Sequence, residues 1–310
     1  MIKVDVIVCT YNRAESLKAT LDALSEQIID RSIEFNVLVV DNNSQDQTKR
    51  VFEDCASHSR HKMHYVFESK QGLSNARNAG VEASRADIIL FTDDDVIPEP
   101  NWVVELSSVF SDRDVEVAGS RILPIWHSPP PRWLTEDLWG YLALLDLGNQ
   151  FVDLEKDTIW GASMGFRRET LISVGLFNPS LGRTKGKLFS GEESAVIRTI
   201  REQGGKVIYT PATTAHHKIE KERVAKRYFR RWALDDGELQ GILFECTNGR
   251  KFLEVPLHRY RKLLTQTLIY VSRVLVRNKH AFPAQLKLLR TWGFISSRIT
   301  NRKLPRKKGP

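Results

Sequence analysis

The sequence predicts an α/β fold with an open, mostly parallel sheet and flanking helices, followed by a basic helical C-terminal region. Over about the first 120 residues, strand-like and helix-like segments alternate with short connections, as parallel βαβ crossovers require. The strand-like segment at 87–91 has an uninterrupted apolar run, which suits a strand covered on both faces. After residue 218 the pattern becomes helical and basic. We therefore expect one domain over residues 1–218 and a separate helical region over 219–310.

The elements of the alternating part can be read in order. The first strand is expected at 3–9, and the helix after it, at 14–27, repeats apolar residues at Leu17, Leu21 and Leu24. The next elements are a strand at 35–40, a helix at 44–56 with Ser44 as its cap, a strand at 63–67, a helix at 74–84 and a strand at 87–91.

The middle of the chain breaks this alternation. Residues 122–157 include "PIWHSPPPRWLTEDLWGY", and their proline and tryptophan content predicts a surface excursion over a site. The expected elements after it are a strand entering a helix at 160–171, a helix at 191–204, a strand at 206–209 and a loop at 210–218.

Composition indicates a cytoplasmic protein that is soluble or lies on the inner face of the cell membrane. The three cysteines, Cys9, Cys55 and Cys246, are odd in number and lack metal-ligand spacing, which fits a reducing compartment. The N-terminus has no signal-peptide pattern, and no window approaches the roughly 20 apolar residues of a spanning helix.

The net charge of +8 is unevenly distributed. From His216 to Pro310 the chain has 23 Lys and Arg against 7 Asp and Glu, a net charge of +16, so the remainder carries −8. The basic last third is expected to face an anionic partner.

Three predicted strands end in unusual polar groups: "CTYNR", "VVDNNSQD" and "LFTDDD". Ligands of open α/β sheets bind beyond the carboxyl ends of parallel strands. Thr10, Tyr11, Asp41 and the aspartates 93–95 are therefore expected at one rim. The plainer alternative for Asp41 is that it caps the following helix.

The three consecutive aspartates predict a metal site. In an extended segment Asp93 and Asp95 share a face while Asp94 points away. A divalent cation removes the repulsion between such carboxylates, and hard oxygen ligands suit Mg²⁺ or Mn²⁺ completed by substrate phosphates. The alternative is an acidic turn that complements the dipole of the following helix.

The ordered motifs resemble a known family. "CTYNR", "VDNNSQD", "GLSNARNAG", "FTDDD", "GASMGFRR", "GEES" and "AHHK" occur in the order found in family 2 glycosyltransferases of GT-A fold, over residues 3–220. The resemblance implies an inverting, metal-dependent enzyme that moves a sugar from a nucleotide-diphosphate sugar, expected to be UDP-linked, to a hydroxyl acceptor.

The resemblance also assigns residues. For the nucleotide-sugar it implies Thr10, Tyr11, Asn12, Arg13, Asp41, Asn43, Arg77, Asp93 and Asp94; for the Mn²⁺ or Mg²⁺ ion it implies Asp93, Asp95 and His217. The general base would be Glu193, the third residue of "GEES", with Glu192 as its rival. The alternatives are a solvated helix arginine for Arg77 and a dipole-complementing glutamate for Glu193.

The acceptor is expected to be a lipid-linked saccharide or a surface polysaccharide precursor. Trp133, Trp160 and Arg167, from the proline- and tryptophan-rich loop and the stretch 160–168, are the candidate acceptor contacts. Polymerising relatives carry "QxxRW" and membrane spans, whereas this chain has "YFRRW" at 228–232. We therefore expect transfer of a single sugar.

The tail contains a predicted amphipathic helix over 257–276. Its apolar residues are Leu257, Tyr260, Leu264, Leu268 or Ile269, Val271 and Leu275, with Arg and Lys between them. Such a helix can lie on an anionic membrane surface, or it can pack on the catalytic domain. Nucleic acid is not expected as a partner because no recognition motif accompanies the charge.

Two other functions compete with sugar transfer. A nucleotidyltransferase shares the α/β sheet and acidic metal site, but usually has a glycine-rich phosphate loop that "CTYNR" lacks. A non-catalytic, membrane-associated scaffold with a degenerate nucleotide pocket is disfavoured by the intact "DDD" and "GEES".

Overall fold

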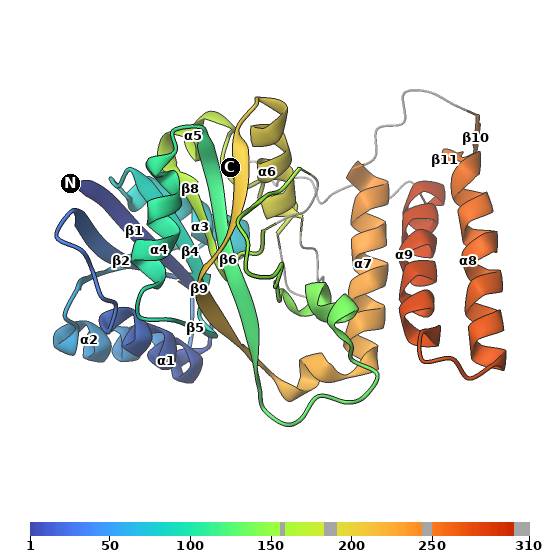
Figure 1. Ribbon diagram of the computed structural model, residues 1–310, viewed down its shortest axis with the longest axis horizontal. Helices are drawn as coiled ribbons and strands as arrows, with labels where there is room; N and C mark the ends of the chain where they lie inside the picture. The colour runs from blue at the N-terminus through green and yellow to red at the C-terminus, as the bar shows by residue number, and fades with distance from the viewer. Residues whose placement is uncertain (156–158, 183–190, 244–249, 301–310) are drawn as a thin grey trace. The chain divides into compact units, whose positions relative to one another are not determined.

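The computed structural model describes residues 1–155, 159–182, 191–243 and 250–300. They form two compact units, which we describe separately (Figure 1). The first comprises Met1–His127, Ala143–Gly182 and Glu192–Ile219. The second contains Ser128–Leu142 and the chain from Glu220 onward. The chain therefore passes from one unit to the other between Ile219 and Glu220.

The first unit is a mixed α/β structure around a sheet of order β3-β2-β1-β4-β8-β6-β9-β5, with β7 paired to β9. Its strands are β1 Ile2–Thr10, β2 Ile33–Asp41, β3 Lys62–Phe67, β4 Ile88–Asp93, β5 Val96–Pro98, β6 Val115–Trp126, β7 Val152–Asp153, β8 Met164–Arg167 and β9 Lys206–Ile219. Its helices are α1 Ala14–Ser25, α2 Thr48–His58, α3 Leu73–Ala83, α4 Trp102–Ser108, the 3-10 turn η1 Val109–Ser111, α5 Arg168–Ser173 and α6 Glu192–Glu202.

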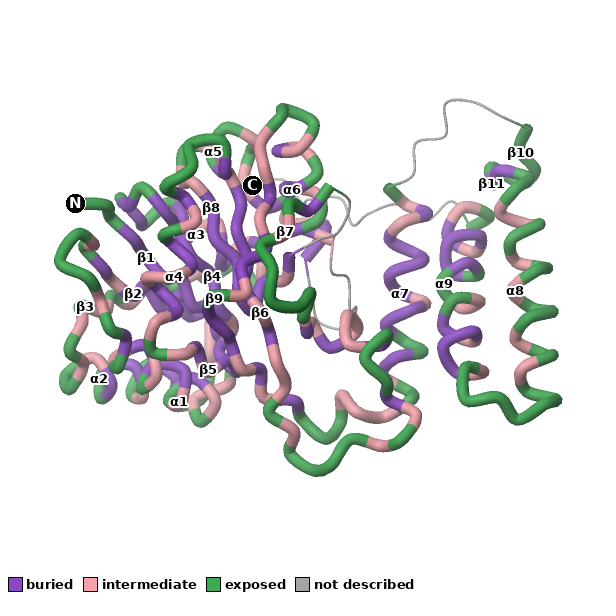
Figure 2. The backbone as a smooth tube through the Cα atoms, in the orientation of Figure 1, coloured by how far each residue is buried: buried purple, intermediate pink, exposed green. Residues whose placement is uncertain are grey.

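The parallel part of the sheet follows the predicted alternation of elements. β3, β2, β1 and β4 run parallel, and their register pairs Thr10 with Asp41 and Cys9 with Asp93. These pairings bring the polar ends of β1, β2 and β4 to one edge. The interior is apolar, with Ile7, Val40 and Ile89 buried in one core cluster (Figure 2). The predicted α/β class with a mostly parallel sheet is confirmed.

The second half of the sheet departs from the sequence prediction. β8 runs antiparallel between β4 and β6, while β6 and β9 are parallel to each other. The expected surface excursion from residue 122 begins later, because β6 continues to Trp126. The expected loop at 210–218 is wrong: it belongs to β9, whose register with β6 shifts between Ser120 and Arg121.

The predicted helix start at Ser44 is also wrong. α2 begins at Thr48, and no side chain caps it from its N-cap residue, Gln47. The Ser44 backbone N–H instead donates to Asp41 Oδ1 at 2.8 Å. The Thr48 N–H donates to Asp46 Oδ1 at 3.0 Å. The segment before the helix is therefore a tight turn built on two aspartates.

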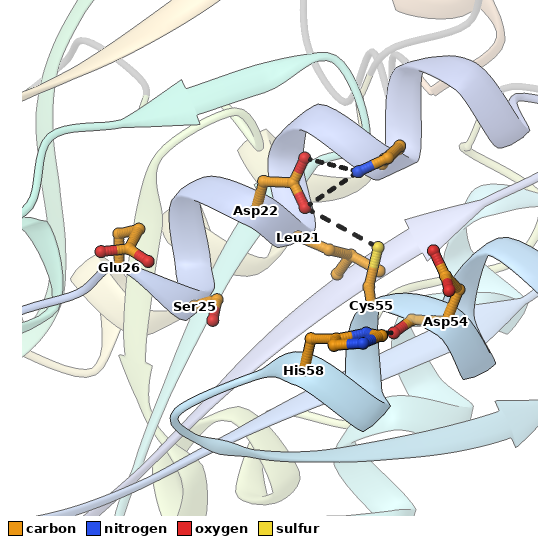
Figure 3. A pocket seen from close by; sticks show the side chains of 8 residues that line it. Leu21, Asp22, Ser25, Glu26, Asp54, Cys55 and His58 are labelled. Carbon is orange, nitrogen blue, oxygen red and sulfur yellow. Dashed lines mark hydrogen bonds and ion pairs between the residues drawn. The ribbon is translucent and has the colours of Figure 1, made fainter.

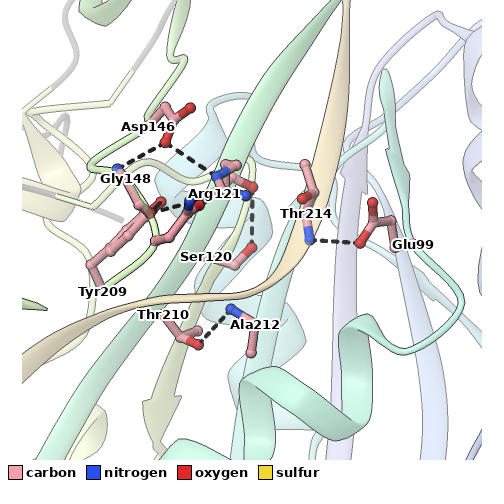
Figure 4. Close-up of polar contacts among 10 residues, drawn as sticks. Glu99, Ser120, Arg121, Asp146, Gly148, Tyr209, Thr210, Ala212 and Thr214 are labelled. Carbon is pink, nitrogen blue, oxygen red and sulfur yellow. Dashed lines mark hydrogen bonds and ion pairs between the residues drawn. The ribbon is translucent and has the colours of Figure 1, made fainter. Parts of the chain in front are cut away.

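Arg121 on β6 forms hydrogen bonds with the segment after Ala143 (Figure 4). Its guanidinium donates to Asp146 Oδ1 at 3.1 Å, to the Gly148 carbonyl at 2.8 Å and to Asn149 Oδ1 at 2.6 Å. The backbones of Ile122 and Leu145 exchange two hydrogen bonds, of 2.7 and 3.0 Å. This part of the chain is thus held against β6.

Where the structure describes it, the second unit consists of helices and one short strand pair. Its elements are the 3-10 turns η2 Glu136–Leu142 and η3 Lys221–Val224, the helices α7 Lys226–Leu243, α8 Leu257–Leu275 and α9 Ala281–Ile299, and the strands β10 Lys251–Phe252 and β11 Val255–Pro256. α9 packs against both α7 and α8 (Figure 1). The contact with α7 is close, since a Cβ added at Gly237 would lie 2.0 Å from the Arg290 carbonyl oxygen. Within the described part of the chain, every helix is too short or too polar to cross a membrane.

Candidate functional site

The polar ends of β1 and β4 contact each other directly. Thr10, the last residue of β1, donates from its hydroxyl to Asp94 Oδ2 at 2.8 Å, and both residues are buried. Arg13, just before α1, lies 3.3 Å from Asp94 Oδ1 through its Nε and 3.0 Å from Asp95 Oδ2 through its Nη2. The "CTYNR" and "TDDD" motifs therefore form one cluster.

The three aspartates are not arranged as a continuing strand. β4 ends at Asp93, and Asp94 and Asp95 occupy the turn before β5. The alternation that would separate Asp94 from Asp95 does not apply in a turn, and Arg13 bridges the two. Burial raises the pKa of Asp94 to about 7, with Arg13 opposing this shift and Asp95 adding to it.

β5 and β9 bring a histidine to the aspartate turn. They pair antiparallel with Val96 opposite His217, and the Lys218 N–H donates to the Asp95 carbonyl at 2.9 Å. His217 Nε2 lies 3.3 Å from Asp95 Oδ1, and both side chains are buried. Its neighbour His216 is half-exposed and lies 3.5 Å from Glu99. Strand alternation thus places His217 at the aspartates.

Arg77 on α3 joins the "DDD" and "GEES" motifs. Its Nη1 lies 3.1 Å from Glu192 Oε1 and 3.0 Å from Glu193 Oε1, and its Nη2 lies 3.9 Å from Asp93 Oδ1. Arg77 is 2% exposed, so it is not a solvated helix arginine. Burial lowers the pKa of Arg77, but Glu193 and Glu192 outweigh this effect and raise it.

The surroundings of Arg77 fix its position. Its guanidinium carbon lies 6.0 Å from the Phe91 ring centroid and 5.4 Å from that of Phe177. At Gly161 an added Cβ would lie 2.0 Å from Arg77 Nη2 and 2.8 Å from Glu193 Oε1. Only glycine leaves room for this arrangement. Trp160, a candidate acceptor residue, is half-buried and precedes Gly161 in the chain.

Asp41 is buried at the end of β2 and already has two donors. Tyr65 donates its hydroxyl hydrogen to Asp41 Oδ2 at 2.5 Å, and the Ser44 N–H donates to Oδ1 at 2.8 Å. Each carboxylate oxygen keeps a second lone pair. Asp41 therefore caps the turn after β2 and does not cap the following helix, which was the alternative role expected for it.

The loops around Asp41 contain the other expected nucleotide contacts. Asn12 and Asn43 have left-handed φ values of 52° and 67°. The Asn12 N–H donates to Ser44 Oγ at 2.9 Å, and its Oδ1 accepts from the Gln45 N–H at 2.7 Å. Tyr11 is 43% exposed. The loops after β1 and β2 are thus tied together, with Tyr11 open to solvent.

Two predicted acceptor residues, Arg167 and Trp133, make structural contacts within their own units. Arg167 pairs with Ile88 at the opposite end of β4 from Asp93, and its guanidinium donates to the carbonyls of Phe110, Asp112 and Val115. Trp133 belongs to the second unit, where its ring packs edge-on against Phe229 and Phe282 at 5.2 and 4.9 Å. The structure gives both residues local structural contacts.

Asp95 and His217 are the candidate metal ligands that the structure brings into contact. Among the residues that the structure describes, no group of three or more His, Cys, Asp or Glu is arranged to hold a metal ion by itself. The adjacent Asp95 carboxylate and His217 imidazole nevertheless form a donor pair. Such a pair suits Mn²⁺ better than Mg²⁺, which prefers oxygen ligands and commonly completes its shell with water and phosphates.

A separate pocket of about 330 Å³ lies between α1 and α2, lined by Lys18, Leu21, Asp22, Ser25, Glu26, Asp54, Cys55 and His58 (Figure 3). The pocket lies toward the C-terminal ends of α1 and α2. The aspartate turn instead lies at the C-terminal ends of the strands, from which the chain enters the helices. Burial raises the pKa of the Cys55 thiol, so the thiolate is disfavoured there. This pocket is not part of the candidate site.

Sequence reasoning missed Tyr65 and Gly161. Tyr65 contacts Asp41 across adjacent strands. Gly161 is required because the side chains of Arg77 and Glu193, which are distant in sequence, occupy the position of a Cβ atom there. Only the quoted "GASMG" motif marked Gly161, and it gave no reason for a glycine. No local pattern marked Tyr65.

Comparison with known proteins identifies the class of this protein as a glycosyltransferase. The model of the family described as Glycosyl transferase family 2 matches residues 5–175, more than half of the chain, and the protein belongs to that family. It is 28% identical over 227 residues to the glucosyl-dolichyl phosphate glucuronosyltransferase of Haloferax volcanii, covering 72% of this chain and 71% of that protein.

Two solved structures share the fold. The mannosyltransferase PcManGT from Pyrobaculum calidifontis, in complex with GDP-Man and Mn²⁺, superposes with a TM-score of 0.63 at 19% identity, covering 96% of this chain and 86% of that one. GalNAc-T7 with UDP, GalNAc and Mn²⁺ superposes with a TM-score of 0.57 at 15% identity over 76% of this chain. The protein spans 47% of the GalNAc-T7 chain.

Proposed function

We propose that the protein is an inverting, metal-dependent transferase that moves one sugar from a nucleoside-diphosphate sugar to a hydroxyl acceptor. We propose UDP as the nucleotide of the donor. One observation carries the proposal. The Arg77 guanidinium lies beside the carboxylates of Glu192 and Glu193 and 3.9 Å from Asp93, so a base candidate and the acidic strand end are joined by one buried arginine.

The donor nucleotide is proposed to lie over the ends of β1 and β2. Asp41 has spare lone pairs for a base N–H, and the exposed ring of Tyr11 offers a stacking surface. Arg13, held between Asp94 and Asp95, is a cation at the place where a diphosphate would reach the aspartates. The UDP and GDP-Man bound in the two structural neighbours support a nucleotide donor without choosing its base.

Asp95 and His217, with Asp93, would hold the divalent cation, and both structural neighbours were solved with Mn²⁺. When bound, the cation would supply positive charge to the diphosphate leaving group. Arg13 adds a second positive charge from the protein itself.

Glu193 is proposed as the general base. It would take the proton of the attacking hydroxyl while that oxygen bonds to the anomeric carbon, and the bond to the diphosphate would break with its electron pair leaving on the nucleotide. Arg77 holds the carboxylate in place, and the first turn of α6 favours an anion through the helix dipole. Glu193 is preferred over Glu192 because it is 7% exposed and Glu192 is 1% exposed.

The acceptor is proposed to be a lipid-linked saccharide or a surface polysaccharide precursor. The name of the Haloferax volcanii relative specifies a dolichyl-phosphate-linked sugar as its substrate. Trp160, which precedes Gly161 in the chain, is the aromatic residue proposed to stack on a sugar.

Calorimetry with UDP and with GDP, with and without Mn²⁺, tests the donor site. We expect metal-dependent UDP binding that Asp95→Ala abolishes, while the matched carboxylate variant Asp54→Ala, on the exposed side of α2, keeps it. If neither nucleotide showed metal-dependent binding, the result would favour a non-catalytic, membrane-associated scaffold.

A panel of sugar nucleotides then tests the reaction. A glycosyltransferase releases the nucleoside diphosphate, whereas a nucleotidyltransferase working in its synthetic direction releases pyrophosphate. Release of pyrophosphate from a nucleoside triphosphate and a sugar phosphate, with no turnover of any sugar nucleotide, would overturn the proposal.

A further inference from the structure

α8 presents an apolar stripe away from the other helices of its unit. It has 19 residues and none of them is buried, whereas α7 and α9 bury many side chains (Figure 2). The stripe consists of Leu257, Leu264, Leu268, Val271 and Leu275, which are 38, 65, 70, 46 and 77% exposed. Their spacing of seven, four, three and four residues places them on one side of the helix.

The side of α8 that faces α9 is made by different residues. Tyr260 and Leu263 pack against the cluster of Val255, Phe294 and Ile295. The Gln285 side chain of α9 donates to the Tyr270 hydroxyl at 3.0 Å. The stripe is therefore additional to the packing of the unit, and a contiguous exposed apolar surface of this kind marks an interaction site.

The charged side chains of α8 and α9 have one sign. Neither α8 nor α9 contains an aspartate or glutamate. Arg261 and Lys262 on α8, and Arg277 and Lys279 just after it, are all exposed. We propose that α8 binds the surface of an anionic lipid bilayer, with the stripe in the headgroup–acyl boundary and the basic side chains at the lipid phosphates.

The stripe and the charge together favour this partner over two others. A second copy of the chain would bring two α8 helices without acidic residues against each other, so their cations would repel. A nucleic acid would use the basic side chains at its phosphates but would leave five aliphatic side chains in water. A bilayer satisfies both features, and because no described helix is long and apolar enough to span it, α8 would lie in its surface.

This surface would keep the enzyme where lipid-linked molecules are found. The membrane inference goes beyond the proposed sugar transfer and does not depend on it. Its test uses neither donor nor acceptor, so a failed vesicle experiment leaves the transferase proposal standing, and the reverse also holds.

Flotation of the full chain with vesicles tests the proposal. We expect binding to vesicles of equal parts phosphatidylglycerol and phosphatidylcholine, weakened by salt, and little binding to phosphatidylcholine alone. The variant with Leu264→Gln, Leu268→Gln and Leu275→Gln should bind the anionic vesicles at least about a hundredfold more weakly. The variant with Arg261→Gln, Lys262→Gln and Lys279→Gln should lose roughly a hundredfold as well.

A matched control removes exposed apolar groups from the first unit. Ile28→Gln with Phe67→Gln replaces residues that are 68 and 57% exposed, and binding should be unchanged. Circular dichroism verifies that each variant is folded. Equal vesicle binding by the wild type and both α8 variants would overturn the proposal. So would a wild-type dimer that does not float and becomes monomeric in the leucine variant, or duplex DNA binding without vesicle binding.

Discussion

Arg77 Nη1 lies 3.0 Å from Glu193 Oε1, and both side chains are almost completely shielded from water. Glu192 Oε1 lies 3.1 Å from the same nitrogen. The arginine is therefore the countercharge of two buried carboxylates from a helix more than a hundred residues later in the chain.

Replacing Arg77 with methionine should destabilise the protein by about 3–5 kcal/mol, because two buried carboxylates would lose their countercharge. Chemical denaturation measures the free energy of unfolding. Arg85→Gln, an exposed arginine just after α3, is the control and should change it by less than about 0.5 kcal/mol. Equal stability of the Arg77 variant and the wild type would show that the carboxylates do not need the arginine.

Glu193→Gln should keep UDP binding and lower kcat by about 10²–10⁴, because an amide cannot accept the hydroxyl proton. Glu192→Gln is the matched variant on the same turn of α6 and should keep most of the turnover. Donor turnover under saturating conditions measures both. Full activity of the Glu193 variant together with an inactive Glu192 variant would exchange their roles.

Gly161→Ala should impair catalysis, since its Cβ would lie 2.0 Å from Arg77 Nη2 and 2.8 Å from Glu193 Oε1. At that separation the arginine and the glutamate must move. Gly148→Ala is a suitable comparison: φ is +84°, with nothing within 4 Å of the added carbon. It should cost about 1–2 kcal/mol of stability through backbone strain and leave kcat unchanged. An active Gly161 variant would mean that the contact tolerates displacement.

Asp94 predicts a pH-dependent stability for the metal-free protein. Burial raises its pKa in the folded state to about 7 from an ordinary value of 3.8. The folded state therefore holds a proton that the unfolded state has lost, and the free energy of unfolding should fall as the pH rises from about 4 to 7. Denaturant titrations at several pH values, without divalent metal, should show that wild type loses stability relative to Asp94→Asn across this range. If the difference in the free energy of unfolding between the two proteins did not change with pH, the raised pKa of Asp94 would be refuted.

The two tryptophans proposed as acceptor contacts should behave differently. Trp160→Ala should raise KM for the acceptor that supports turnover, with a small effect on unfolding, because Trp160 lies beside Gly161 in the chain. Trp133→Ala should lower the free energy of unfolding by about 2–4 kcal/mol, since its ring packs on Phe229 and Phe282. Acceptor saturation curves and denaturation curves separate the two effects. Normal acceptor saturation in the Trp160 variant would remove that residue from the acceptor site.

The parallel part of the sheet could be predicted because each of its strands carries its own evidence. β1, β2 and β4 are mostly apolar, and α1 repeats Leu17, Leu21 and Leu24, all of which are buried. The rim containing Thr10 and Asp94 follows from strand order alone. Local sequence is enough where strands pair in parallel through regular crossovers.

The second half could not be predicted in this way. β9 contains a proline, threonines and histidines that resemble a loop, and it is a strand because β6 and β5 supply its hydrogen-bond partners. The centre at Arg77 was missed for a similar reason. The resemblance implied a residue near the nucleotide, whereas the carboxylates that surround Arg77 come from Glu192 and Glu193, 115 residues or more away in sequence. Both the β9 strand and the Arg77 contacts depend on partners that lie far away in the sequence.

The irregular stretch of β9 around Pro211, where its pairing with β6 shifts, determines which of two adjacent imidazoles reaches Asp95. Because neighbouring side chains on a strand point to opposite faces, deleting one residue there would exchange the positions of His216 and His217. The proposed ligand set would then change although neither proposed ligand had been mutated. At the proposed metal site, the length of that irregular stretch would therefore decide which histidine is available to a cation.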